Sequence, residues 1–126
     1  MPRSVRIGVI GAGSATFSLG LVKDLCLTEN LRGSEVSFMD IDADRLDAVT
    51  RMAERYTAEI GSDLRFEQTT ERADCLADCD FVINTAAVQG HYHQADMRDV
   101  YARHGYYYRA PAGNGFYNFS LMMDVA

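Results

Sequence analysis

The sequence predicts an α/β protein built on a Rossmann-like, doubly wound parallel sheet. Segments typical of strands alternate four times with segments typical of helices. The first strand-like segment, Val5–Ile10, is a β-branched run of the kind found in parallel strands that are buried on both faces. A glycine turn, Gly11-Ala-Gly13, separates that run from the first helical pattern. Together these observations predict the order β-α-β-α-β-α-β-α with right-handed crossovers.

The first β-α-β unit follows from three patterns. After the glycine turn, apolar residues recur at helical spacing from about Ala15 to Cys26. A polar connection at Thr28–Ser34 leads to a second strand, Glu35–Met39, which ends at Asp40. The ligand crevice of such a unit lies at the carboxyl ends of its strands.

The second half of the chain continues the alternation. Asp42 is a predicted N-cap and Gly61 a predicted C-terminal stop for a helix with one apolar face. The remaining predicted elements are a strand at 64–69, a short helix at 71–77, a strand at 80–85 and a polar helix from about His91 to His104 that stops at Gly105. Residues 106–114 are predicted to be an aromatic loop, and residues 116–126 the start of a further helix that has no stop signal. We therefore expect residues 1–126 to be an NAD-binding Rossmann domain that forms the N-terminal portion of a longer protein, or one domain cut from it.

Composition narrows the classes of partner. The 126 residues carry a net charge of −6, which disfavours a nucleic-acid partner. No apolar run reaches the length of a membrane span and no signal-peptide pattern is present. These features predict a cytoplasmic protein with no membrane partner. The three cysteines are an odd number, which argues against a disulfide framework.

The glycine turn indicates a pyrophosphate site. The first glycine permits the tight turn, the second lets a phosphate approach the backbone, and the following helix start offers unpaired N–H groups. Ser14 adds a hydroxyl there. Thr16 stands where the third glycine of the G-x-G-x-x-G pattern usually lies, which predicts that the helix sits slightly further from the sheet. Without its surroundings, the same pattern also fits an ordinary strand–helix turn.

Asp40 favours NAD as the cofactor. A carboxylate at the end of the second strand can accept both hydroxyls of the adenine ribose and repels the 2′-phosphate of NADP. The alternative is a solvated strand end without a ligand. Asn84, at the end of the fourth strand, is a candidate contact to the nicotinamide ribose or the substrate, and the alternative there is a buried asparagine that satisfies loop backbone.

Other polar and aromatic residues carry weaker signals. His91 is a candidate substrate contact, and a helix-start histidine bound to backbone is the alternative. Cys75 and Cys79 have C-x-x-x-C spacing, which lies outside the common zinc and redox patterns. The aromatic residues at 106–108 and 116–117 fit either a sugar platform or a surface that packs against a further domain or subunit.

Three motifs together resemble the NAD- and metal-dependent family 4 glycoside hydrolases. They are Val9-Ile-Gly-Ala-Gly-Ser-Ala-Thr-Phe17, Met39-Asp-Ile-Asp-Ala-Asp-Arg-Leu46, and Asp80-Phe-Val-Ile-Asn-Thr-Ala86 with Gly90-His91. The resemblance extends through His104-Gly-Tyr-Tyr107 and weakens after Arg109. It implies that NAD is bound by Gly11, Ala12, Gly13, Ser14, Ala15, Thr16, Phe17, Asp40 and Asn84.

The resemblance also implies an activity for the full-length protein. The family oxidises the sugar at C3 by hydride transfer to NAD, and a tyrosine base then removes the C2 proton while a divalent metal, commonly manganese, stabilises the negative charge. The aglycone is eliminated, water adds, and the hydride returns. The resemblance places the metal ligands and the base beyond Ala126, so we expect no metal site and no turnover in residues 1–126. It also implies a homo-oligomer for the full-length protein. The segments Gln89–Gln94 and Gly105–Tyr108 resemble the branch of the family that acts on unphosphorylated α-glucosides, α-galactosides or uronides, and not the phospho-sugar branch, whose corresponding stretch is basic and contains proline. The resemblance thus implies unphosphorylated α-glycosides as substrates.

Two other functions remain open from the sequence. One is an NAD-dependent 2-hydroxy-acid dehydrogenase of the lactate or malate type, for which Arg98 and Arg109 are available although neither sits in a recognisable loop motif. The other is a non-catalytic NAD-binding module.

Overall fold

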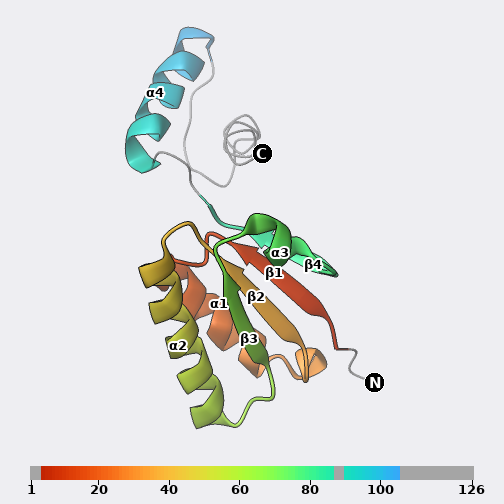
Figure 1. The fold of residues 1–126 in the computed structure, drawn as a ribbon. Helices are drawn as coiled ribbons and strands as arrows, with labels where there is room; N and C mark the ends of the chain where they lie inside the picture. Colours follow the sequence, from red (N-terminus) through yellow and green to blue (C-terminus); the bar gives the residue numbers. More distant parts are fainter. Residues whose placement is uncertain (1–3, 87–89, 106–126) are drawn as a thin grey trace. The chain divides into compact units, whose positions relative to one another are not determined.

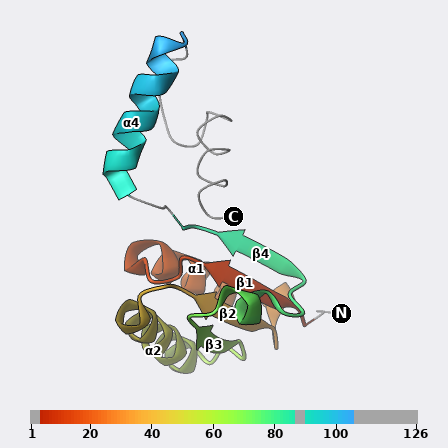
Figure 2. The same cartoon turned by 45° about the horizontal axis from the view of Figure 1, so that its top comes forward.

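Four parallel strands form one sheet in the order β3-β2-β1-β4 (Figures 1 and 2). The computed structural model describes residues 4–86 and 90–105. The strands are β1 (Arg6–Ile10), β2 (Glu35–Met39), β3 (Arg65–Thr69) and β4 (Phe81–Asn84). The strand order reverses at β1, because the chain moves outward to β3 on one side and returns to β4 on the other. The predicted Rossmann-like sheet is therefore confirmed.

The helices cover both faces of this sheet. Helix α1 (Ala15–Leu27) packs beside α2 (Ala43–Ile60), whereas the short α3 (Arg72–Leu76) contacts β1, β2 and β3 (Figure 1). Successive residues of a strand point to opposite faces. Val9 belongs to the core beneath α1 and α2, and the neighbouring Gly8 faces Cys75 of α3 and Cys79, which follows that helix. The sheet is thus doubly wound, as the sequence predicts.

The core lies between the sheet and the pair α1 and α2. Alternate residues of β1 and β2 point into it, and the apolar stripes of both helices close it from the other side. Phe38 is fully buried, and its ring lies 5.3 Å from that of the partly buried Phe66. The buried cluster consists of Ile7, Val9, Ala12, Val22, Leu25, Val36, Phe38, Leu46, Val49, Ala53 and Leu64.

Helix α2 begins and ends as its sequence predicts. The Asp42 carboxylate accepts a hydrogen bond from the backbone N–H of Arg45 at 3.1 Å, which satisfies one of the unpaired N–H groups of the first turn. Gly61 adopts a left-handed conformation, with φ of +69°, and ends the helix. The polar connection between α1 and β2 contains a 3₁₀ turn, η1 (Glu29–Leu31), which the sequence patterns did not predict.

The chain divides into two compact units, residues 1–85 and 86–126. The described part of the second unit contains α4 (Gly90–Arg103), which agrees with the polar helix predicted there. Gly105 has φ of +80° and its N–H donates to the carbonyl of Ala102, so it ends the helix as expected. The predicted aromatic loop and final helix lie outside the described residues. Across the described ranges, no helix has the length and apolar character needed to cross a membrane.

Candidate functional site

The glycine turn is bound to the end of β2. Gly11 has φ of +86°, a conformation that glycine adopts without steric cost. The backbone N–H groups of Gly11 and Ala12 both donate to the carbonyl of Met39, at 2.8 and 3.0 Å. The turn therefore bends over the carboxyl end of the neighbouring strand, where backbone hydrogen bonds hold its first two residues.

Gly13 and Asp40 are in direct contact. The Gly13 N–H donates to Oδ2 of Asp40 at 2.8 Å. A Cβ atom added at Gly13 would lie 2.7 Å from that oxygen and 2.8 Å from the Asp40 Cγ, closer than real Cβ contacts allow. Sequence reasoning assigned this glycine to phosphate approach alone, whereas in the structure the Asp40 carboxylate already requires it. The two residues, 27 positions apart, form one unit.

The Asp40 carboxylate is held in place by backbone donors. Its second oxygen, Oδ1, accepts the N–H of Asp42 at 3.0 Å, and the side chain is partly buried. An ionised carboxylate offers about four lone-pair positions, so two N–H bonds leave capacity for two further donors such as hydroxyls. Ile41, the next residue, is 88% exposed beside it.

The start of α1 presents polar groups toward solvent. Ser14 is the N-cap and its hydroxyl makes no capping hydrogen bond, while residues 14–17 are all exposed. No acidic residue lies in the first turn, so the helix start keeps its preference for an anion. Thr16 points outward and is therefore not the spacer between helix and sheet that the sequence predicts. The buried contact is made by Ser18, whose Oγ donates to the Ala12 carbonyl at 2.6 Å.

Thr85 joins β4 to the glycine turn. Its Oγ1 lies within hydrogen-bond distance of the carbonyls of Ile10 and Gly11, at 3.0 and 3.2 Å, and its N–H donates to Ile10 at 2.8 Å. Asn84 pairs in register with Ile10 and is exposed, so the alternative of a buried asparagine is wrong. Sequence reasoning placed Asn84 and the loop from Thr85 at this edge, but it missed the contact of the Thr85 hydroxyl with the turn and the role of Ser18. A signal for Ser18 was present, because a serine interrupts the apolar pattern of α1 close to the turn.

The structure brings only part of the predicted site together. Residues 11–17, Asp40 and Asn84 lie at the carboxyl edge of the sheet. His91 lies in the first turn of α4, in the second unit, so its relation to that edge stays a prediction. The predicted aromatic platform at 106–108 and 116–117 lies outside the described residues. Within the described ranges, no group of three or more metal-ligating side chains gathers.

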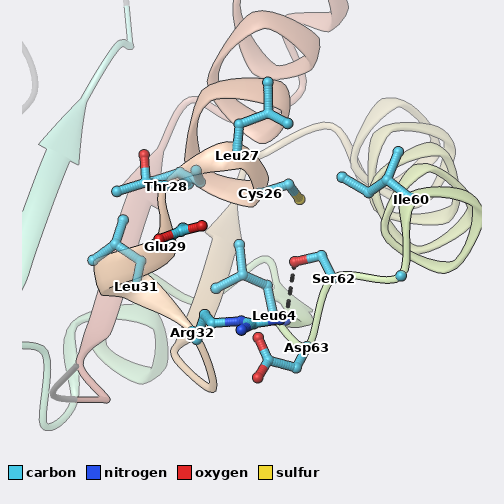
Figure 3. Close-up of a pocket in the computed structure, with 12 residues that line it drawn as sticks. Cys26, Leu27, Thr28, Glu29, Leu31, Arg32, Ile60, Ser62, Asp63 and Leu64 are labelled. Atoms are coloured by element: carbon cyan, nitrogen blue, oxygen red, sulfur yellow. Dashed lines mark hydrogen bonds between the residues drawn. The ribbon is translucent and has the colours of Figure 1, made fainter. Parts of the chain in front are cut away.

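A cavity of about 210 Å³ lies at the opposite edge of the sheet (Figure 3). Its walls come from the ends of α1 and α2, the η1 turn and the connection into β3. Because α1 and α2 begin near the glycine turn and end at this cavity, the two features are separated by the length of these helices. The cavity is lined by Leu25, Cys26, Leu27, Thr28, Glu29, Leu31, Arg32, Ile60, Gly61, Ser62, Asp63 and Leu64. It is therefore distinct from the glycine turn and its acidic partner.

The fold and this carboxyl edge define a Rossmann-type domain, with the glycine turn at the point where the strand order reverses. The model of the family described as "Family 4 glycosyl hydrolase" matches residues 6–120. The chain belongs to this family, which confirms the resemblance seen in the sequence.

Relatives agree with this assignment, and a solved structure has the same fold. The chain is 33% identical over 86 residues to an alpha-galactosidase of Bacillus subtilis, covering 68% of this chain and 20% of that protein. It is 27% identical over 116 residues to a 6-phospho-alpha-glucosidase of Leptotrichia buccalis, covering 90% and 26%. The 6-phospho-beta glucosidase of Thermotoga maritima, solved with NAD and glucose-6-phosphate, has a TM-score of 0.70 at 24% identity, covering 98% of this chain and 28% of that one. The chain thus spans about a quarter of the length of these proteins.

Proposed function

We propose that this chain is the NAD-binding domain of an NAD-dependent glycosidase that cleaves unphosphorylated α-glycosides. The contact between Gly13 and Asp40 carries the proposal, because it joins the glycine turn to a carboxylate suited to a ribose. The cofactor contacts we propose are the backbone of residues 11–13, the exposed helix start at 14–17, Asp40 and Asn84.

The residues present fit the two ends of NAD. Exposed N–H groups at the start of α1 and the Ser14 hydroxyl, which makes no capping hydrogen bond, suit a pyrophosphate, and no acidic side chain in the first turn of α1 opposes it. Asp40 retains acceptor capacity for ribose hydroxyls, and its charge disfavours a 2′-phosphate. When bound, NAD supplies reversible oxidation of the sugar at C3. The role proposed for the chain itself is to hold and orient the cofactor beside β4.

The names of the relatives support a glycosidase, but they differ in whether the sugar substrate carries a phosphate. Two carry names without a phosphate, the alpha-galactosidase and an alpha-glucosidase of Erwinia rhapontici, which is 31% identical over 80 residues. The Leptotrichia buccalis relative and a structural neighbour solved with NAD and Mn²⁺ are 6-phospho-alpha-glucosidases. We propose unphosphorylated α-glycosides as the substrates, because residues 89–94 and 105–108 resemble the branch of the family that acts on such sugars. The manganese ligands and the catalytic base are expected beyond Ala126.

Substrate release by the longer protein tests the proposal. With NAD and Mn²⁺, it should release nitrophenol from a nitrophenyl α-glycoside faster than from the corresponding 6-phosphate. Faster release from the 6-phosphate would overturn the choice of unphosphorylated sugars but leave the glycosidase in place. Hydride transfer to a 2-oxo acid, without glycoside cleavage, would instead favour the dehydrogenase alternative. Residues 1–126 alone should show no turnover. A cytoplasmic location and a homo-oligomeric state stay predictions for the longer protein.

A further inference from the structure

Two cysteines lie together beneath the first strand, away from the proposed cofactor contacts. Cys75 is in α3 and Cys79 follows it by four residues. Both sulfur atoms lie within 3.5 Å of the point where a Cβ atom of Gly8 would stand. The Cys79 Sγ also lies 3.0 Å from the carbonyl oxygen of Cys75. Gly8 thus marks a close approach of two thiols to one strand, which explains a glycine in the middle of a buried strand.

The two thiols differ in their access to solvent. Cys75 is fully buried and its Sγ–H donates to the carbonyl of Ser37 at 3.3 Å. Burial raises the pKa of the Cys75 thiol, so this group is a poor first nucleophile. Cys79 is only partly buried and lies on the segment that leads out of α3. A reagent from solvent therefore meets Cys79 before it meets Cys75.

The backbone between the two cysteines is not a continuous helix. Residues four apart on a helix have Cβ atoms about 5–6 Å apart, whereas a disulfide requires roughly 3.5–4.5 Å. Helix α3 ends at Leu76, and Asp78 adopts a left-handed conformation with φ of +56°, so Cys79 lies outside the regular helix. The segment between the helix end and Cys79 is exposed and can supply a small inward shift. A disulfide closed in this way carries some strain, which makes it readily reducible.

We propose that Cys75 and Cys79 form a reversible thiol–disulfide site whose co-reactant is a low-molecular-weight disulfide such as oxidised glutathione. The Cys79 thiolate attacks one glutathione sulfur, which forms a mixed disulfide and expels the other glutathione as a thiolate. Cys75 then loses its proton and attacks the Cys79 sulfur, which closes the protein disulfide and expels the second glutathione. Two protein thiols are oxidised and one glutathione disulfide is reduced to two thiols, which take up the two protons.

The third cysteine is a control within the same chain. Cys26 is partly buried on the other side of the sheet, where its sulfur lies 3.6 Å from the hydroxyl of Thr57. It has no thiol partner among the described residues. Simple thiol exposure would make Cys26 react about as readily as Cys79, but only Cys79 has a second thiol positioned to displace the glutathione.

The test is thiol mapping of the full chain after exposure to graded ratios of oxidised to reduced glutathione. Trypsin leaves both cysteines in one peptide, residues 73–98, so the disulfide appears as the loss of two hydrogens from that peptide. We expect this product at ratios where Cys26 stays a thiol or a mixed disulfide, and its complete reversal by reduced glutathione. Cys75→Ser should stop at the mixed disulfide on Cys79. Cys79→Ser should leave Cys75 unmodified, with Cys26→Ser as the matched control that changes neither result.

Three outcomes would overturn the proposal. They are a mixed disulfide on Cys79 that persists in the unsubstituted chain, modification of Cys75 at an undiminished rate in Cys79→Ser, and no reaction of residues 73–98 under conditions that modify Cys26. A circular-dichroism spectrum of each serine variant checks that it is folded. If one variant fails to fold, the unsubstituted chain still decides, since its product is either the closed disulfide or the persistent mixed one.

Discussion

Replacing Gly13 with alanine should destabilise the fold through a single collision. The new Cβ would lie 2.7 Å from Oδ2 of Asp40, so the carboxylate must move and its 2.8 Å hydrogen bond from the Gly13 N–H is lost. Gly13 is not among the glycines with positive φ, so alanine meets no backbone penalty there. A hydrogen bond to a charged group contributes about 1.5–3 kcal/mol. We therefore expect a loss of about 2 kcal/mol, or about 8 °C in Tm for a chain of this length.

Urea unfolding of four variants measures this effect. Asp40→Ala removes the atoms with which the new Cβ would collide, so Gly13→Ala should cost little in that background, and the two changes should be strongly non-additive. Gly20→Ala is the matched control, because nothing lies within 4 Å of a Cβ added there and alanine favours a helix. It should stabilise the chain by about 0.5–1 kcal/mol. If Gly13→Ala unfolds at the same urea concentration as the unsubstituted chain, or if its cost persists in Asp40→Ala, the inferred contact is wrong.

Three further changes test other parts of the structure. Asp42→Ala removes the N-cap of α2 and should lower the free energy of unfolding by about 1 kcal/mol in urea titration, whereas asparagine at this position should retain most of it. Thr85→Val removes the hydroxyl near two carbonyls of the glycine turn and should cost about 1 kcal/mol, while Thr85→Ser should remain close to the original stability. Desolvation raises the pKa of Glu67, but hydrogen bonds from neighbouring side chains and the charge of Arg6 outweigh it, so the folded pKa is below the usual 4.5. The ionised carboxylate therefore stabilises the fold above pH 4.5, and this contribution is lost as the pH falls through the folded pKa. Glu67→Gln should weaken that pH dependence in acid unfolding, and an unchanged acid profile would contradict a lowered pKa at Glu67.

Patterns with a direct local cause predicted the fold well. The β-branched run before the glycine turn follows from burial, and the polar connection before β2 marks where that strand begins, so both strands were found within one or two residues. Asp42 and Gly61 act through their own backbone chemistry, which is why both ends of α2 were correct. The η1 turn has no comparable signal, because its residues satisfy no periodic pattern.

Contacts between distant segments were harder to predict. The sequence indicated that Gly13 and Asp40 belong to one site. It did not indicate that the carboxylate fills the space beside the glycine, because this depends on how β2 ends relative to the turn. The sequence predicted that Thr16 separates α1 from the sheet, because Thr16 occupies the position of the third glycine in the G-x-G-x-x-G pattern. In the structure, the rotation of α1 gives the buried contact to Ser18 instead. Such orientations depend on tertiary packing, which spacing alone does not specify.

Calorimetric titration of the chain with NAD and with NADP tests the proposed cofactor site most directly. NAD should bind more tightly, because the Asp40 carboxylate accepts ribose hydroxyls and repels a 2′-phosphate. Asp40→Asn removes the charge and should narrow the difference between the two cofactors, mainly by weakening NAD binding. Equal affinity for NAD and NADP in the unsubstituted chain, or a preference for NADP, would contradict the proposed role of Asp40 in selecting NAD.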